Sequence, residues 1–398
     1  MNRNTDTPRK KIFLDTNLQL IFAVTLIAVM GVGSIVPAFP MIIREIGVSS
    51  TGIGMLITVF AFPGILLAPL LGVLADRYGR KRILVPSLML FGVAGGSCFF
   101  VQDFRLLLVL RFFQGIGAVS LASLNLTMIG DLYSGRERVD AMGYNASVLS
   151  IGAAGYPAVG GILATFGWHY PFALPWLAIP LGIVVIFLLK NPEPKIEQEG
   201  MKAYFANALK GIGNRQVIGI FFASIMTFIL LYGTFLTYFP LLLADSFDAS
   251  PLTIGLIMGG MSLVTAVTSS QLGTLVSIFS ARTLLKAAFL LYGVALFMIP
   301  LTPNLWLFLI PTVIFGIGHG INWPCIFTLL TELAPVDYRA TFLSVNGMIF
   351  RLGQTLGPLL MGAVLSTWGI AGTFYTGALL SVVVSVLGVI LIREPEGV

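Results

Sequence analysis

The sequence predicts an all-α membrane protein with about a dozen spans. Hydrophobic residues make up 57% of the 398 residues, charged residues make up only 10%, and the mean hydropathy is +0.95. A soluble domain carries about 25% charged residues, because its surface faces water. The apolar residues also come in runs of the length that a helix needs to cross a bilayer, about 20 residues. Most of the surface is therefore expected to face lipid.

Twelve apolar runs follow one another, each separated from the next by charges or turn residues. The expected spans are 18–42, 52–75, 83–101, 105–129, 140–165, 169–189, 217–243, 252–276, 283–301, 305–331, 340–366 and 372–392. The basic residues Arg9, Lys10 and Lys11 before the first run are also typical of a signal peptide. That run continues to Ile43 without an A-x-A cleavage site, so we interpret it as an uncleaved span.

The distribution of Lys and Arg predicts that both termini are cytoplasmic. In that orientation the inside segments hold 19 of them, and the outside loops hold Arg44 and Arg105 only. An excess of basic residues marks cytoplasmic loops. The expected location is the cell (inner or cytoplasmic) membrane, in a multi-pass topology. Because the basic residues lie in short loops without a basic stripe, nucleic acid is not an expected partner despite the net charge of +6.

Other chemistries find little support. The two cysteines, Cys98 and Cys325, lie in apolar runs and form neither a disulfide framework nor a metal-ligand pattern. The spans contain no paired acids and no Ser–His arrangement. We therefore expect no enzyme, no cofactor and no metal.

A polar stretch from Lys190 to Arg215 divides the spans six and six. The expected organisation is a first bundle at 1–189, a linker at 190–216 and a second bundle at 217–398. The halves are repeats at an offset of 201 residues. The matched pairs include Gly72 with Gly273, Gly115 with Gly316, Asn145 with Asn346, Pro157 with Pro358, and Gly161 with Gly362. Two such repeats predict a central cavity between them and alternating access by rocking.

The loop after the second span reads Gly72-Val-Leu-Ala-Asp-Arg-Tyr-Gly-Arg-Lys-Arg-Ile-Leu84. It resembles the signature G-x-L-A-D-R-x-G-R-K-x-x-L of the major facilitator superfamily at every fixed position. The resemblance extends over the whole chain. It implies the major facilitator fold, with two pseudo-symmetric six-helix bundles around a central cavity.

This loop is a candidate gate formed by Gly72, Asp76, Arg77, Gly79 and Arg80. Gly72 permits close helix approach and Gly79 permits a tight turn. In the family the Asp latches the two bundles on the cytoplasmic side near a helix N-terminus, a placement that the helix dipole favours. The second copy has serine at 277 and 280 and isoleucine at 278, so the latch is expected on one side only.

The fourth span contains Leu110-Arg-Phe-Phe-Gln-Gly-Ile-Gly-Ala118 and resembles the family element R-x-x-Q-G-x-G-A. Arg111, Gln114 and Asn125 fall on one face of that helix. The resemblance implies that Arg111 and Gln114 couple transport to proton movement. The alternative is an arginine that extends its head group to the outer membrane surface.

The fifth span contains Gly152-Ala-Ala-Gly-Tyr-Pro-Ala-Val-Gly-Gly161. It resembles the motif G-x-x-x-G-P-x-x-G-G of drug–proton antiporters, with Tyr156 in place of one Gly. Gly152, Pro157 and Gly161 are expected to support packing and rocking, as are Gly357 and Pro358 at the repeat position. The motif favours efflux, although a purely structural role is the alternative.

All 17 Asp and Glu residues fall in loops or at span ends. Within the spans, Arg111, Arg351 and His319 supply the strongly basic or titratable groups. Arg351 lacks a neighbouring acid, so substrate or backbone must compensate its charge. His319 is the best embedded proton carrier, because the ordinary pKa of histidine is ~6.5; a hydrogen-bonded core histidine is the alternative.

The expected substrate cavity contains polar and aromatic residues from several spans. They are Asn125, Tyr144, Tyr232, Tyr238, His319, Asn322, Trp323, Arg351 and Gln354. The aromatic members are equally typical of core packing or of the belts at membrane interfaces.

These observations predict a monomeric secondary transporter in the lipid bilayer that exports small amphiphilic molecules by proton antiport. The first alternative is an exporter or flippase of anionic or lipid-like substrates, which the unpaired Arg351 favours. The alternative of another class is a membrane receptor or scaffold, which would not need the gate motif or the embedded charges.

Overall fold

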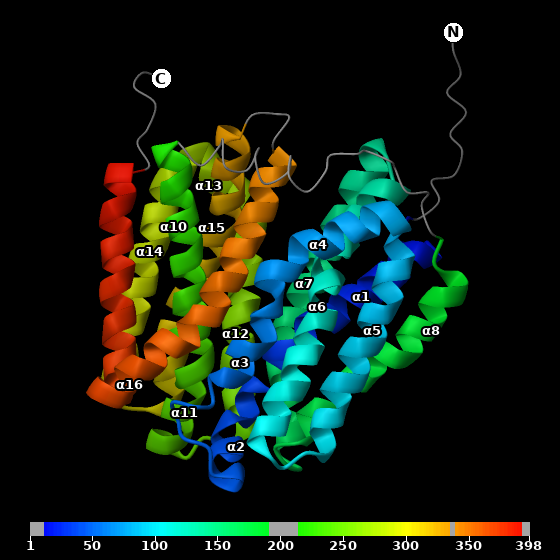
Figure 1. Cartoon of the computed structure of the whole chain (residues 1–398). Coiled ribbons are helices and arrows are strands. Elements are labelled where there is room, and N and C mark those ends of the chain that lie inside the picture. The colour runs from blue at the N-terminus through cyan, green and yellow to red at the C-terminus, as the bar shows by residue number, and fades with distance from the viewer. Residues whose placement is uncertain (1–11, 191–213, 335–338, 392–398) are drawn as a thin grey trace.

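The computed structural model describes residues 12–190, 214–334 and 339–391, which are helical almost throughout (Figure 1). Within these ranges, eleven helical segments are long and apolar enough to cross a membrane. The last segment has 47 residues, and its helix α16 (Arg339–Leu391) turns at Gly369, where φ is 69°. A helix of that length measures about 70 Å and can cross a bilayer twice. Together the segments account for the twelve predicted spans.

The first half of the chain supplies six spans, two of which are broken at proline. The first span passes from α1 (Thr16–Gly33) through η2 (Val36–Ala38) into α2 (Phe39–Ile46), and the second combines α3 (Met55–Ala61) with α4 (Pro63–Tyr78). Proline lacks an amide hydrogen, so it suits helix starts and interrupts helix interiors. The short η1 (Ile12–Leu14) precedes the first span. The remaining elements are α5 (Arg80–Ser97), η3 (Cys98–Phe100), α6 (Phe104–Leu132), α7 (Gly135–Ala164), η4 (Tyr170–Leu177) and α8 (Ala178–Leu188).

The second half repeats this plan with one irregular span. That span joins α10 (Arg215–Phe228) to a π-helix (Ile229–Leu236) and α11 (Thr237–Phe247). The other elements are α12 (Pro251–Ser270), α13 (Leu272–Ile278), α14 (Ala281–Met298), η6 (Ile299–Leu301), η7 (Leu305–Phe308), α15 (Leu309–Leu333) and α16. Most of the expected linker lies outside the described residues, since the description omits 191–213.

The two halves contact one another near one end of the molecule. We call the end where α1 begins and α16 ends the terminal face, and the other end the opposite face (Figure 1). At the opposite face α7 packs on α12, where Gly255 leaves room for the Pro157 carbonyl and Gly259 for that of Ala154. On the other side of the molecule, α3 packs on α16, and the Thr58 hydroxyl donates to the Thr355 carbonyl at 3.0 Å. These contacts close the opposite face.

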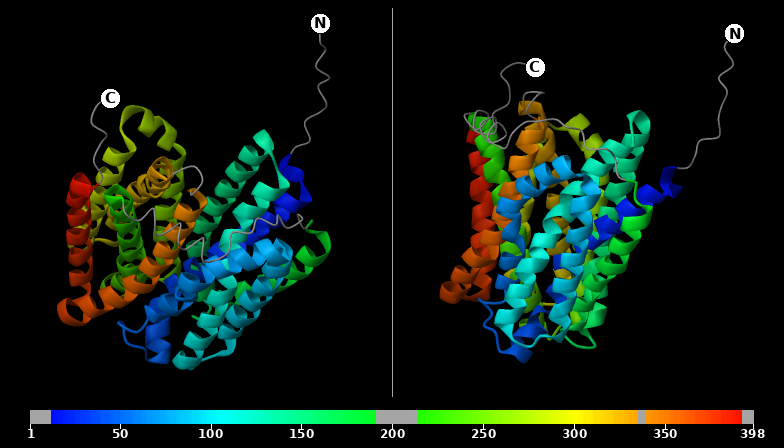
Figure 2. Two further views of the ribbon diagram at one scale, coloured as in Figure 1. Left: turned by 45° about the horizontal axis from the view of Figure 1, so that its top comes forward. Right: turned by 45° about the vertical axis from the view of Figure 1, so that its right-hand side comes forward.

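The same helix pairs separate toward the terminal face, as the left view of Figure 2 shows. A Cβ atom added at Gly72, Gly143, Gly273 or Gly347 would meet no atom within 4 Å. One buried apolar core lies in the first half near the terminal face. The other fills the second half and continues into the opposite-face ends of the first. The structure is therefore open at the terminal face.

Gly255→Leu is expected to prevent closure of the opposite face, because a side chain there overlaps the Pro157 carbonyl. Overpacking costs about 1–3 kcal/mol, which shifts the population by about tenfold. A cysteine at buried Thr58 should then react faster with a membrane-impermeant maleimide added on that side. Gly260→Leu on the same helix is the control, since a Cβ at Gly260 meets nothing. Equal labelling in the two variants would contradict the expectation.

Candidate functional site

Arg351 lies where the two halves meet. Its side chain from α16 crosses Gly64 of α4, where an added Cβ would be 2.9 Å from the Arg351 Cδ. Its Nη1 donates to Gln354 Oε1 at a long 3.4 Å, and Tyr232 of the π-helix lies beside both residues. The ion pairs among the described residues are Arg44–Asp245, Arg80–Asp76 and Arg80–Asp131. The Arg351 charge is thus unneutralised by a carboxylate in the described part of the chain.

The π-helix places Tyr232 at this point. Gly233 and Gly357 approach so closely that a Cβ on either would meet the backbone of the other segment. The Thr237 hydroxyl donates to the Tyr232 carbonyl at 2.6 Å. This bond satisfies a backbone carbonyl that the wider π-helical turn leaves available. Single π turns inside α-helices occur frequently at functional sites. Gly357 and Pro358 therefore serve close packing against a non-standard helical turn.

An aromatic cluster (Phe228, Tyr232, Trp323, Phe327 and Phe350) adjoins the Arg351 group. Trp323 of α15 lies 4.3 Å from Phe350 and 5.2 Å from Phe228, measured between ring centroids. Phe228 in turn stacks on Tyr232 at 5.8 Å. The sequence singled out Tyr232 and Trp323. It missed the three phenylalanines, because a phenylalanine in an apolar run carries no signal that separates a cavity wall from lipid contact.

Two other predicted residues of α15 face different neighbours. The Thr227 hydroxyl donates to Asn322 Oδ1 at 2.9 Å, which ties α15 to α10. His319 Nδ1 lies 2.7 Å from the Tyr292 hydroxyl, which ties α15 to α14. Asn322 is fully buried, whereas His319 is half-buried. Within the described residues, His319 is thus tied to α14 and Asn322 to α10, so the two side chains do not share a partner.

The remaining predicted cavity residues are dispersed. Asn125 is buried, and its Nδ2 donates to Thr25 Oγ1 at 2.9 Å in a network that joins α6 to α1. Tyr238 is fully buried, and its hydroxyl donates to the Pro358 carbonyl at 3.3 Å within the closed opposite face. Tyr144 is 42% exposed and contacts Phe13 near the terminal face. The structure does not bring these three residues to the Arg351 group.

Arg111 is fully buried inside the first half. Its Nη1 donates to the Gly31 carbonyl at 2.8 Å and to Gln114 Oε1 at 2.7 Å, and its Nε donates to the Leu56 carbonyl at 3.2 Å. The guanidinium also lies 4.2 Å above the Phe60 ring. Backbone carbonyls next to the breaks in the first two spans therefore compensate this charge, as an embedded arginine requires.

Arg111→Lys is expected to destabilise the protein, because an ammonium cannot reproduce the fork that serves three acceptors. Losing one hydrogen bond to a charged group costs about 1.5–3 kcal/mol. The melting temperature in detergent should fall, while Arg105→Lys at the exposed start of α6 should leave it unchanged. An unchanged melting temperature with an altered pH dependence of transport would instead support a coupling role.

The candidate gate joins three helix ends in the first half. Arg80, at the start of α5, contacts Asp76 in the last turn of α4, and its Nε donates to Asp131 Oδ2 of α6 at 3.1 Å. Gly79 between the helices has φ of 99°, a conformation that strains other residues. The Arg77 guanidinium lies over the Tyr78 ring. The Asp76 side chain is 55% exposed on the open terminal face.

A second polar link lies on the same face. Tyr133 follows the last residue of α6, and its hydroxyl donates to Asp15 Oδ1 at 2.7 Å. Asp15 in turn caps the N-terminus of α1. Burial raises the pKa of Asp15, but hydrogen bonds from Tyr133 and from the amides of Leu18 and Asn17 outweigh it, so the carboxyl pKa is lowered. Burial and the bond to Asp15 raise the pKa of Tyr133. This link fixes the end of α6 that carries Asp131.

The glycine–proline element of α7 contacts both halves. Gly152 faces Leu26 of α1, where an added Cβ would lie at 3.0 Å. Pro157 and Gly161 instead face α12 of the second half, against Gly255 and Pro251. The element therefore forms part of the surface along which the halves meet.

Comparison with known proteins agrees with this architecture. The family model for the Major Facilitator Superfamily matches residues 21–243 and 220–398. The chain belongs to this superfamily. Among curated proteins of Bacillus subtilis (strain 168), it is 25% identical to Multidrug resistance protein 1, over 89% of this chain and 90% of that protein. It is 26% identical to the Bacillibactin exporter, over 88% and 90%.

The solved structures give the same fold. The crystal structure of a D-xylose-proton symporter superposes with a TM-score of 0.79 at 15% identity, over 96% of this chain and all of that one. The protein is thus a multi-pass membrane transporter of the major facilitator superfamily, which moves small molecules across the membrane.

Proposed function

We propose that this transporter exports small amphiphilic molecules, in multidrug-type efflux, by proton antiport with alternating access. The observation that carries the proposal is the aromatic cluster, which includes Tyr232, beside Arg351 and Gln354 at the meeting point of the halves. Apolar walls with a few polar groups suit amphiphilic ligands. Two relatives that match nearly the whole chain are named as a resistance protein and an exporter, which supports the same direction.

In this proposal, residues 1–189 and 217–398 rock as two bundles joined by 190–216, within a monomer. The terminal face is cytoplasmic in the cell membrane, because the described helix ends on that side carry basic residues such as Arg80, Arg136 and Arg282, whereas the opposite face carries Arg44 and Arg105. The described conformation is then the one open to the cytoplasm, in which substrate enters toward Arg351. Closure of the terminal face and opening of the opposite face release it outside.

One observation favours a second substrate class, namely anionic or lipid-like molecules. Arg351 forms no ion pair within the described residues, and Gln354 is a neutral partner. A half-buried cation without a compensating charge is costly, so an anionic substrate group would be stabilised there. A fork of guanidinium donors also matches a carboxylate or phosphate in bidentate geometry.

The direct test uses purified protein in liposomes with an imposed pH gradient. Ethidium serves as the cationic probe and carboxyfluorescein as the anionic probe. We expect a gradient-dependent flux of at least one probe that a protonophore abolishes, and the preferred probe decides between the two substrate classes. Absence of gradient-dependent flux for both probes and for a panel of neutral amphiphiles would contradict the proposal.

His319 is proposed as a proton carrier, since it is the embedded group whose ordinary pKa lies nearest neutrality. His319→Gln should therefore reduce the response of transport to the pH gradient. Tyr292→Phe is the matched variant, because it removes only the hydroxyl that contacts His319 Nδ1. Unchanged pH dependence in His319→Gln would move coupling to Asp76, Asp131 or another acid at the cytoplasmic end.

A further inference from the structure

A single glycine of the first half lies against the Arg351 side chain. The three atoms nearest to a Cβ built at Gly64 of α4 all belong to Arg351, namely Cδ at 2.9 Å, Nε at 3.0 Å and Cγ at 3.1 Å. Since none of the three is a backbone atom, a side chain at this position would displace the arginine stem before it displaced a helix. Gly64 thus leaves a slot on α4, which the stem of Arg351 occupies.

This slot is what the first half contributes to a group that otherwise comes from the second half. The Arg351 Nη1 donates to Gln354 Oε1 at 3.4 Å, and Tyr232 lies beside both residues. A hydrogen bond of this length is weak, so Gln354 alone holds the guanidinium loosely. The contact of the stem with α4 therefore supplies a second constraint on the direction of the head group.

The internal repeat shows the same complementarity of size in reverse. The contact of α3 and α4 with α16 is repeated by α12 and α7, as the glycine–proline contacts on both sides of the molecule show. At the offset of 201 residues, Gly64 corresponds to Thr265, and Arg351 corresponds to Ser150. The long side chain thus lies opposite glycine, and the larger residue of the other pair corresponds to a short partner. Gly64 therefore accompanies Arg351 and is not a general requirement of this contact.

We propose that Gly64 is a positioning residue, which directs the Arg351 guanidinium toward Gln354 and Tyr232 so that it binds an anionic group of the substrate. The inference rests on the proposed transport function and on its anionic substrate class. A guanidinium binds carboxylate or phosphate through two parallel hydrogen bonds, which require a fixed orientation. A methyl group at position 64 would push the stem out of the slot and remove this orientation, although the charge would stay.

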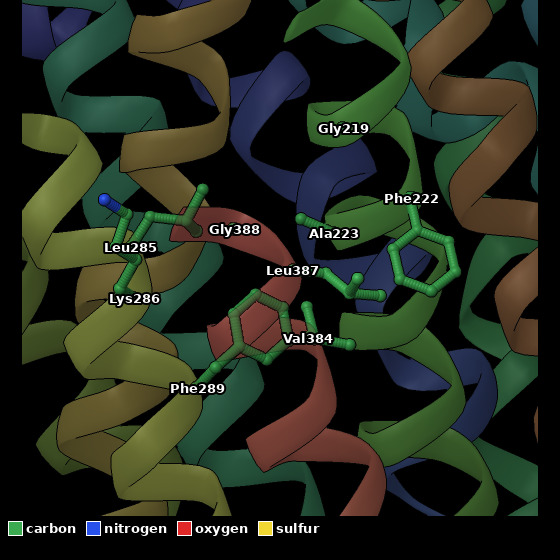
Figure 3. A pocket seen from close by; sticks show the side chains of 9 residues that line it. All are labelled: Gly219, Phe222, Ala223, Leu285, Lys286, Phe289, Val384, Leu387 and Gly388. Atoms are coloured by element: carbon green, nitrogen blue, oxygen red, sulfur yellow. The ribbon is translucent and has the colours of Figure 1, made fainter. Parts of the chain in front are cut away.

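The depression shown in Figure 3 offers no alternative site for a dye-sized probe. It lies between α10, α14 and α16 and holds only about 10 Å³. Phe289 and Val384 in its lining are almost fully buried. We therefore expect such a probe to bind at the meeting point of the halves and not in this depression.

The test measures binding of carboxyfluorescein and ethidium to the purified full chain in a neutral detergent by fluorescence anisotropy. Gly64→Ala is expected to weaken carboxyfluorescein binding about tenfold or more, because at least one hydrogen bond to a charged group is lost. Ethidium binding should stay unchanged. Arg351→Gln should weaken carboxyfluorescein binding at least as much. Adding Gly64→Ala to Arg351→Gln should cause no further loss, since both changes act on one interaction.

Gly182→Ala is the matched control. An added Cβ there also overlaps the end of a flexible side chain, 2.8 Å from Met89 Cε, but within the first half. It should leave binding of both dyes unchanged. Equal loss of both dyes in Gly64→Ala, an additive loss in the double variant, or a wild-type protein that does not bind carboxyfluorescein would overturn the proposal. The expected binding pattern without gradient-driven flux would instead contradict the proposed antiport and support the role of Gly64.

Discussion

Asp76→Asn is expected to slow transport by about 5–30-fold while insertion and folding remain intact. This expectation rests on how residues of the two halves pair along their contact at the closed opposite face. Along α3, α4 and α16, Gly54 faces Pro358, Thr58 faces Thr355, and Gly64 faces Arg351. From Gly54 to Gly64 the first segment advances ten residues, while α16 goes back seven, from Pro358 to Arg351. Continued to the terminal face, this antiparallel register brings Asp76 to the first turns of α16, which begins at Arg339.

Closing the terminal face would therefore place the Asp76 carboxylate at a helix N-terminus. A carboxylate there gains about 1–2 kcal/mol from unsatisfied amides and the helix dipole, and an amide loses most of that gain. In the described conformation Asp76 is half-exposed and contacts Arg80 only within its own half. The interaction thus favours one state selectively, which is what a latch requires.

The repeat supplies the control. Gly161, Pro157 and Ala154 face Pro251, Gly255 and Gly259 in a matching register, which brings Ser277 to the start of α7.

Ser277→Ala should transport normally, because no charge is lost at that position. Labelling of a cysteine at Thr58 from the opposite side should fall in Asp76→Asn, since the outward-open state is less populated. Wild-type transport rates in Asp76→Asn would show that the latch role is wrong.

Arg351→Lys is expected to impair anionic substrates by about 10–150-fold more than neutral or cationic ones. The lysine keeps the charge but cannot form two parallel hydrogen bonds to a carboxylate or phosphate. Each hydrogen bond to a charged group contributes about 1.5–3 kcal/mol. The aliphatic stem that contacts Gly64 is retained in the variant, so the packing of α16 on α4 should survive.

The measurement compares carboxyfluorescein and ethidium flux in the same liposomes. Gln354→Leu is the matched variant, because it removes the neutral partner of Arg351 and leaves the guanidinium. Equal loss for both probes in Arg351→Lys would assign a structural role to Arg351. No loss for either would mean that the residue faces water, and the cationic-drug proposal would gain.

The sequence by itself determined the membrane class, the twelve spans and the family. Long apolar runs and basic loops are properties of local composition, and the loop from Gly72 to Leu84 is a contiguous motif. The embedded charges were also visible, because Arg111, Arg351 and His319 stand out in apolar surroundings. Each of these signals is readable without knowing which helices are neighbours.

Only the tertiary structure decided what those side chains contact. Arg111 donates to the Gly31 and Leu56 carbonyls. Every residue has a backbone carbonyl, so the sequence does not indicate which ones will accept these hydrogen bonds. Tyr238 was grouped with the cavity by residue type, yet it lies in the closed opposite face. Gly255 and Gly260 are the same residue type on one helix. Gly255 contacts the first half of the chain, whereas Gly260 faces open space. The difference arises from the packing of helices distant in the chain, which local composition does not encode.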